Sequence, residues 1–116
     1  MDHGTLVAGC VSAMTNNEIG VASVGWSVKL MGISCGQDPP SLSHPYEGLL
    51  AAAQMGADII NMSFGSTSWT ESNQVLINFI SEEFGCVLVA SAGNSGVQDA
   101  NYPASYDNVI SVTATD

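Results

Sequence analysis

Apolar and polar positions along the chain form blocks that predict helices and strands in turn. Three blocks place apolar residues at helical spacing, which predicts a buried helix from His3, a second helix capped by Ser43 and a third around residues 75–84. Four shorter blocks are almost continuously apolar and predict strands at residues 28–33, 58–62, 86–91 and 109–113. This alternation predicts an α/β fold, a parallel β-sheet with helices on both faces, because parallel strands need crossover connections.

The stretch from Cys86 to Gly96 changes from a buried strand to a polar turn within a few residues. Parallel sheets place their chemistry at the carboxyl ends of strands, so the residues after this strand are candidates for a site. Asn94 offers a side-chain amide N–H that could stabilise a developing oxyanion. The alternative is that Asn-Ser-Gly here is only turn chemistry.

His3 lies in the first turn of the first predicted helix. The helix dipole disfavours a cation at this end, which would help to keep the imidazole neutral and able to accept a proton. The alternative is an ordinary capping or surface histidine.

Composition excludes several classes of partner. The 116 residues suffice for one small domain, and a hydrophobic content of 46% predicts a packed core. A formal charge of −10, with one basic residue, excludes nucleic-acid binding and disfavours anionic membranes. We find no membrane-spanning run and no signal peptide in the sequence. Cys10, Cys35 and Cys86 each have apolar neighbours and are expected to be buried free thiols.

Four motifs, in order and covering nearly the whole chain, resemble subtilisin-like serine peptidases (the subtilase family). Residues 3–9 resemble the segment around the catalytic histidine, and residues 60–65 the substrate-binding strand. Residues 89–96 are similar to the segment that carries the oxyanion asparagine, and residues 102–112 to the Tyr-Pro-Ala loop and following strand. The resemblance implies a subtilisin-like three-layer α/β/α fold and peptide-bond hydrolysis by a Ser-His-Asp mechanism.

The resemblance also implies roles for individual residues. His3 would be the general base and Asn94 the oxyanion donor. The remaining residues would bind an extended peptide: Ser63, Phe64 and Gly65 by main-chain pairing, Gly36 from the opposite strip of the cleft, and Ser91, Ala92 and Gly93 as one wall of the primary specificity pocket. Small residues in that wall imply room for a large apolar side chain, and Asn101 is placed near the base of the pocket.

The loop at residues 15–21 resembles the family's strong calcium loop. The resemblance implies ligands from the carbonyls of Thr15, Ile19 and Val21 and from the Asn17 side chain, all hard oxygen donors. Calcium would be a structural ion, and the chemistry itself would need no cofactor. The alternative is a plain surface turn.

Two parts of the family pattern are missing from the sequence. No aspartate-bearing strand precedes His3, since Asp2 is adjacent to it, and no Gly-Thr-Ser segment supplies a nucleophile. We therefore expect residues 1–116 to be a partial peptidase domain, truncated at both ends, inactive alone and prone to self-association. By family, the protein would be extracellular or secreted.

Two other functions remain as alternatives. A non-catalytic module that keeps the peptide cleft is the main one. An unrelated nucleotide-binding domain is a distant third, because no glycine fingerprint follows the first predicted strand and only Lys29 could meet phosphate.

Overall fold

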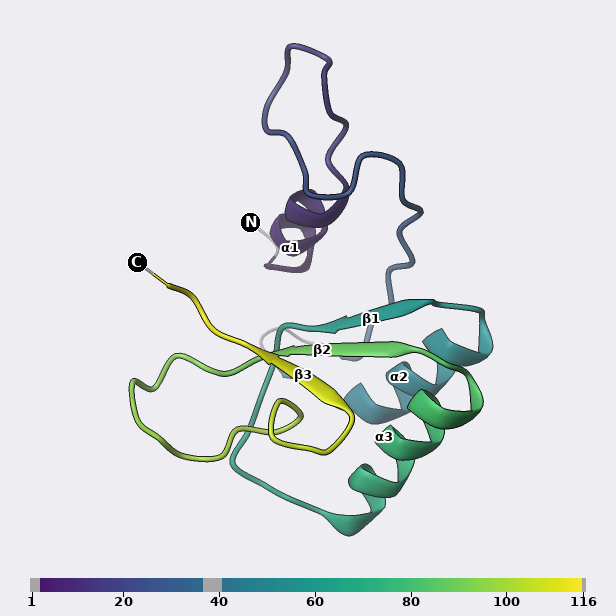
Figure 1. Cartoon of the computed structure of the whole chain (residues 1–116), viewed down its shortest axis with the longest axis vertical. Helices are drawn as coiled ribbons and strands as arrows, with labels where there is room; N and C mark the ends of the chain where they lie inside the picture. The colour runs from purple at the N-terminus through teal and green to yellow at the C-terminus, as the bar shows by residue number, and fades with distance from the viewer. Residues whose placement is uncertain (1–2, 37–40, 116) are drawn as a thin grey trace. The chain divides into compact units, whose positions relative to one another are not determined.

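The chain forms two compact units, Met1–Gly32 and Ile33–Asp116, in a computed structural model that describes residues 3–36 and 41–115. The placement of the units relative to one another is not determined, so each is described by itself (Figure 1). The expectation for Asp2 lies outside the described residues, as does most of the turn or loop that the sequence predicts at residues 38–41.

The first unit consists of helix α1 (His3–Ser12) and the loop that follows it. Val24 N donates to the carbonyl of Cys10 over 3.1 Å, and Gly25 N donates to that of Val11 over 2.9 Å, so the loop returns to the end of the helix. The predicted helix at His3 is confirmed. The expectation that it is buried is wrong, because no residue of α1 is buried and its own short unit offers little to pack against.

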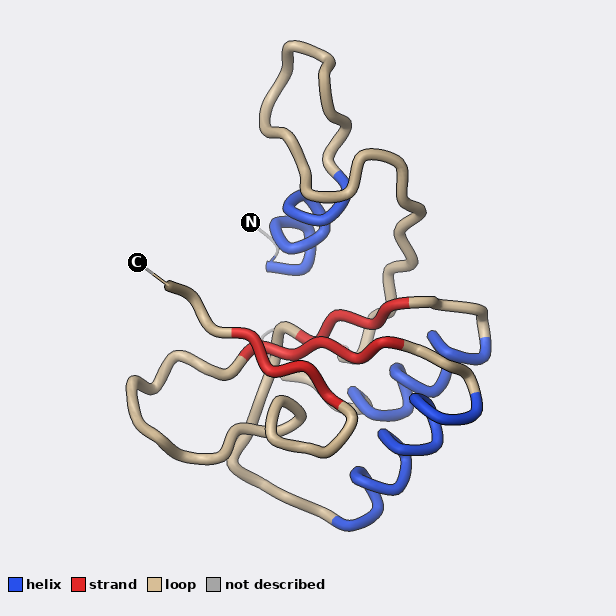
Figure 2. The backbone as a smooth tube through the Cα atoms, in the orientation of Figure 1, coloured by secondary structure: helices blue, strands red, loops and turns tan. Residues whose placement is uncertain are grey.

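The second unit contains a three-stranded parallel sheet in the order β1-β2-β3 (Figure 2). Its elements follow along the chain as α2 (Pro45–Gln54), β1 (Ile59–Met62), α3 (Glu71–Glu83), β2 (Val87–Ser91) and β3 (Val109–Val112). The predicted α/β fold with a parallel sheet is confirmed. The predicted strand at residues 28–33 is wrong, because these residues pair with no strand among those described.

Local sequence explains where the two helices of this unit begin and end. Pro45 occupies the first turn of α2, where its missing N–H costs no hydrogen bond, and the N-cap is His44 rather than the predicted Ser43. Thr70 caps α3 by accepting a hydrogen bond from Asn73 N over 3.3 Å. Gly85 then adopts a φ of 67°, a left-handed conformation that ends the helix readily.

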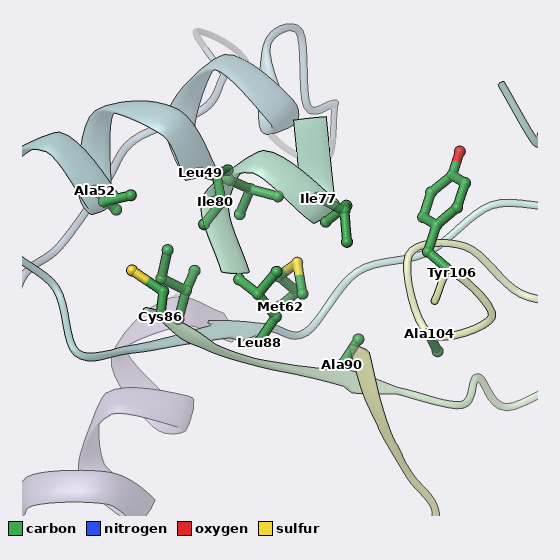
Figure 3. Close-up of a cluster of buried hydrophobic side chains, with 12 residues drawn as sticks. Leu49, Ala52, Met62, Ile77, Ile80, Cys86, Leu88, Ala90, Ala104 and Tyr106 are labelled. Carbon is green, nitrogen blue, oxygen red and sulfur yellow. The ribbon is translucent and has the colours of Figure 1, made fainter. Parts of the chain in front are cut away.

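The core of the second unit lies between one face of the sheet and both of its helices (Figure 3). Alternate strand residues point to this face, and Met62, Leu88 and Ala90 are almost completely buried. Ile77 and Ile80 of α3 meet them, and both are 0% exposed. The opposite face of the same sheet carries exposed apolar side chains, at Ile59, Val87, Ile110 and Val112.

The three cysteines are free but differ in burial. Cys86 is buried as expected, and its thiol donates to the carbonyl of Ala57 over 2.9 Å. Cys35 is half-buried, and Cys10 is exposed on α1, so the expectation of burial is wrong for Cys10. None of the helices in residues 3–36 and 41–115 has the length and hydrophobicity that a membrane span requires.

Candidate active site

The candidate site lies where β1 and β2 end. The two strands run parallel with Met62 paired to Ala90, so the residues that follow them emerge at the same edge of the sheet. Ser63 leaves β1 there and Ser91 is the last residue of β2. This is the edge at which open α/β sheets bind their ligands.

Asn101 connects the segments that follow the two strands. Its Nδ2 donates to the Ser91 carbonyl over 3.1 Å. A Cβ added to Gly65 would collide with the Asn101 amide, lying 2.6 Å from Oδ1, and a Cβ on Gly93 would lie 3.3 Å from Nδ2. The structure therefore brings Ser63, Phe64 and Gly65 together with Ser91, Ala92 and Gly93, with the Asn101 side chain between them.

The backbone around Asn101 is held in place by its own hydrogen bonds. Asn101 N donates to Ser105 Oγ over 3.1 Å, and Ser105 N donates back to the Asn101 carbonyl over 2.8 Å. Tyr102 forms an antiparallel bridge with Ser66, and the peptide bond between Tyr102 and Pro103 is cis. Asn101 is thus fixed between the segments that follow β1 and β2. Its expected place at the base of a specificity pocket stays a prediction.

Asn94 lies in the exposed loop just beyond the end of β2. Gly93 precedes it with a φ of 101°, which a residue with a side chain rarely adopts, so glycine permits the change of direction here. Asn94 therefore follows the central strand, as the sequence predicts. Its role toward an oxyanion stays a prediction.

Gly36 belongs to a different part of the second unit. The Cys35 carbonyl accepts hydrogen bonds from Ser43 N over 2.8 Å and His44 N over 3.1 Å. These residues line a hollow of about 400 Å³ together with Ser34 and Gly36. Burial raises the pKa of the Cys35 thiol, with a smaller contribution from the nearby Glu47 carboxylate.

His3 is the first residue of α1 and belongs to the first unit. Asn94 belongs to the second unit, so their convergence on one cleft stays a prediction.

The loop after α1 contains the expected calcium ligand Asn17. Asn16, Glu18 and Gly20 all have φ between 61° and 68°, and the loop curls around a hollow of about 180 Å³ lined by residues 16–22. Asn17 Oδ1 accepts a hydrogen bond from Ile19 N over 3.2 Å. The donors are of the hard oxygen type that calcium prefers, but the expected ligands are fewer than the six to eight that it takes.

A cluster of tyrosines beside the site carries no signal in the sequence. Tyr106 stacks at a tilt against Tyr102 with ring centroids 4.6 Å apart, and meets Tyr46 edge-on at 6.3 Å. The Tyr106 hydroxyl accepts a hydrogen bond from Thr70 N over 3.1 Å, which ties the loop near the site to the start of α3. Burial raises the pKa of the Tyr46 hydroxyl above its usual range, and the neighbouring Tyr106 adds to this.

The chain is similar to known proteins of one family in both sequence and structure. A sequence model of the subtilase family matches residues 1–116. The chain is 40% identical to a thermostable alkaline protease of Halalkalibacterium halodurans over 98% of its own length and 32% of that protein. It is 35% identical to thermitase of Thermoactinomyces vulgaris, covering 98% of this chain and 41% of thermitase.

A solved structure gives the same result. The chain matches a psychrophilic subtilisin-like protease from the Antarctic psychrotroph Pseudoalteromonas sp. AS-11 with a TM-score of 0.79 and 34% identity. The match covers 98% of this chain and 27% of the solved one, so the chain spans roughly a third of the proteins it resembles. The chain belongs to the subtilase family of serine proteases.

Proposed function

We propose that the chain is a segment of a serine endopeptidase catalytic domain to which both of its units belong. The main support is the edge formed by Ser63–Gly65 and Ser91–Gly93, where two parallel strands end side by side and Asn101 links them. Gly65 is exposed, so an extended peptide could pair with its backbone.

In this proposal the chain contributes part of the chemistry. The His3 imidazole takes a proton from a serine nucleophile and returns it to the leaving amine. The Asn94 side chain donates a hydrogen bond to the oxygen of the tetrahedral intermediate. Gly36 lines the opposite side of the peptide cleft.

The 116 residues by themselves are then inactive. Triad residues act as a unit, and the sequence contains neither the Gly-Thr-Ser nucleophile segment nor an aspartate-bearing strand before His3. We expect no turnover of a fluorogenic peptide by the pure chain and no labelling by a serine-reactive phosphonate. Turnover accompanied by labelling of a residue in this chain would contradict the proposal.

The alternative function is a non-catalytic module that binds extended peptides. The coding region distinguishes the two, because an aspartate-bearing strand upstream and a Gly-Thr-Ser segment downstream favour the endopeptidase. Both functions predict binding of an extended peptide at Gly65 and Gly93. Nuclear magnetic resonance titration with such a peptide tests this shared step, and unchanged amide signals at both glycines would contradict it.

Three further properties belong to the same proposal. Calcium bound by the loop around Asn17 would stabilise the first unit, so removing calcium with a chelator should lower the melting temperature. The exposed apolar face of the sheet supports self-association, which light scattering would detect as a mass above that of the monomer. Secretion follows from the family resemblance.

A further inference from the structure

Helix α3 carries a second apolar surface that does not face the core. Ile77 and Ile80 point inward and are 0% exposed. Val75 and Phe79, one turn apart, are 60% and 46% exposed, and Phe84 at the end of the helix is 40% exposed. Phe79 and Phe84 meet edge-to-face with ring centroids 5.6 Å apart, so the three side chains form a surface that we call the α3 stripe.

Carboxylates lie at both ends of the α3 stripe. Glu71 precedes Val75 by four residues, and Glu82 and Glu83 follow Phe79 by three and four, which places each on the adjacent turn. All three glutamates are exposed. The apolar centre of the stripe is therefore bounded by negative charge along the helix.

The placement of Glu82 and Glu83 is electrostatically unfavourable. Both lie in the last turn of α3, where the helix dipole is negative and cations are preferred, and that turn has no basic residue. The chain has one residue of the Lys and Arg type, Lys29, and it lies in the other unit. A cation supplied from outside the chain would relieve both the repulsion between the glutamates and the unfavourable dipole.

We propose that the α3 stripe is a docking surface for a basic amphipathic segment of another polypeptide. Apolar side chains of the segment cover Val75 and Phe79, and its lysine or arginine side chains pair with Glu82 and Glu83. Charge complementarity selects this partner over a second copy of the chain, because a second copy would bring a further formal charge of −10 to an acidic surface.

Binding of a labelled peptide to the whole chain tests the proposal. The probe is a peptide of leucine and lysine about four helical turns long, with leucine on one face, and fluorescence anisotropy reports its affinity. Phe79→Ser and the double variant Glu82→Gln/Glu83→Gln should each weaken binding about tenfold, and added salt should weaken it further. A second peptide has glutamine in place of each lysine. Its affinity for the wild type should be as low as the affinity of the lysine peptide for Glu82→Gln/Glu83→Gln.

Matched variants on α2 and at its C-cap, Met55, provide the controls. Met55→Ser removes an apolar side chain that is 65% exposed, and Glu47→Gln removes a carboxylate whose side chain is 72% exposed. Both should leave the affinity within about twofold of the wild type. Circular dichroism checks that Phe79→Ser folds. If Phe79→Ser does not fold, Val75→Ser takes its place, because this variant leaves the contact between Phe79 and Phe84 intact.

Three outcomes would overturn the proposal. These are no binding of the lysine peptide, an equal loss of affinity in the α2 controls, and a chain dimer that Phe79→Ser dissociates. The last result would show that a second copy, rather than a basic segment, covers the α3 stripe.

Discussion

Replacing Gly65 by alanine tests the packing that joins the two halves of the candidate peptide-binding edge. Gly65 has no left-handed φ, so alanine is compatible with its backbone conformation. The added methyl would nevertheless collide with the Asn101 carboxamide, whose Nδ2, Oδ1 and Cγ are the nearest atoms. The conflict is with one side chain, and it should disappear when that side chain is shortened.

The structure gives the size of each effect. Overpacking by one methyl in a well-packed site costs about 1–3 kcal/mol, which we expect for Gly65→Ala alone. Asn101→Ala removes the hydrogen bond to the Ser91 carbonyl and should cost about 1 kcal/mol. The double variant should be no less stable than Asn101→Ala alone, which corresponds to a coupling energy of about 1–3 kcal/mol.

Urea unfolding followed by circular dichroism measures the four free energies of unfolding in this cycle. Each kcal/mol should also change the melting temperature by roughly 4 °C for a chain of this size. Gly32→Ala is the control, because a Cβ at Gly32 meets nothing within 4 Å, and it should be neutral or slightly stabilising. Additive effects of Gly65→Ala and Asn101→Ala would refute the contact between these residues.

Three other predictions concern the core, a helix cap and the thiols. Met62→Ala, at a site 0% exposed, should lower the free energy of unfolding by about 2–5 kcal/mol, and a loss below about 1 kcal/mol in urea would contradict the burial. Thr70→Ala should lower the free energy of unfolding by about 1 kcal/mol, and Thr70→Ser should lower it much less, because serine can still accept a hydrogen bond from Asn73 N. Equal losses of stability in the two variants on thermal unfolding would exclude the cap. A thiol reagent should modify exposed Cys10 first and Cys86 last, because Cys86 is buried and burial raises the pKa of its thiol. Simultaneous labelling of the two thiols in the native protein would be inconsistent with this order.

Much of the fold could be predicted from the pattern of apolar residues. Helical spacing located the three helices of the described residues. For α2 and α3 the reason is that a helix next to a core must present apolar residues every three or four positions, whereas α1 shows the same spacing with no buried residue. The apolar run at residues 28–33 gave a wrong prediction for a physical reason. Such a run indicates that a segment avoids water, whereas a strand also requires a hydrogen-bonded partner, which sequence spacing does not reveal.

The position of part of the candidate site was predictable, because polar residues that follow a buried strand lie at the edge of the sheet. Asn94 stands out because it lies just beyond an apolar strand, whereas the role of Ser63 was implied by the family resemblance. Parallel pairing of β1 and β2 brings the ends of these strands to one edge. The Asn101 contacts with Gly65 and Gly93 depend on how a long loop folds back, and the tyrosine cluster depends on packing between distant segments. Exposure of Cys10 likewise follows from how α1 packs rather than from its apolar neighbours.

The proposed endopeptidase function requires the His3 imidazole and the Asn94 side chain to lie at one peptide cleft. Paramagnetic broadening measures this directly, with a nitroxide on Asn94→Cys in a chain whose Cys10 and Cys35 are serine. The chain has 2 histidines, so the ring signals of His3 can be assigned against those of His44. We predict strong broadening of the His3 ring signals, and His3 signals unchanged by the nitroxide would contradict the account.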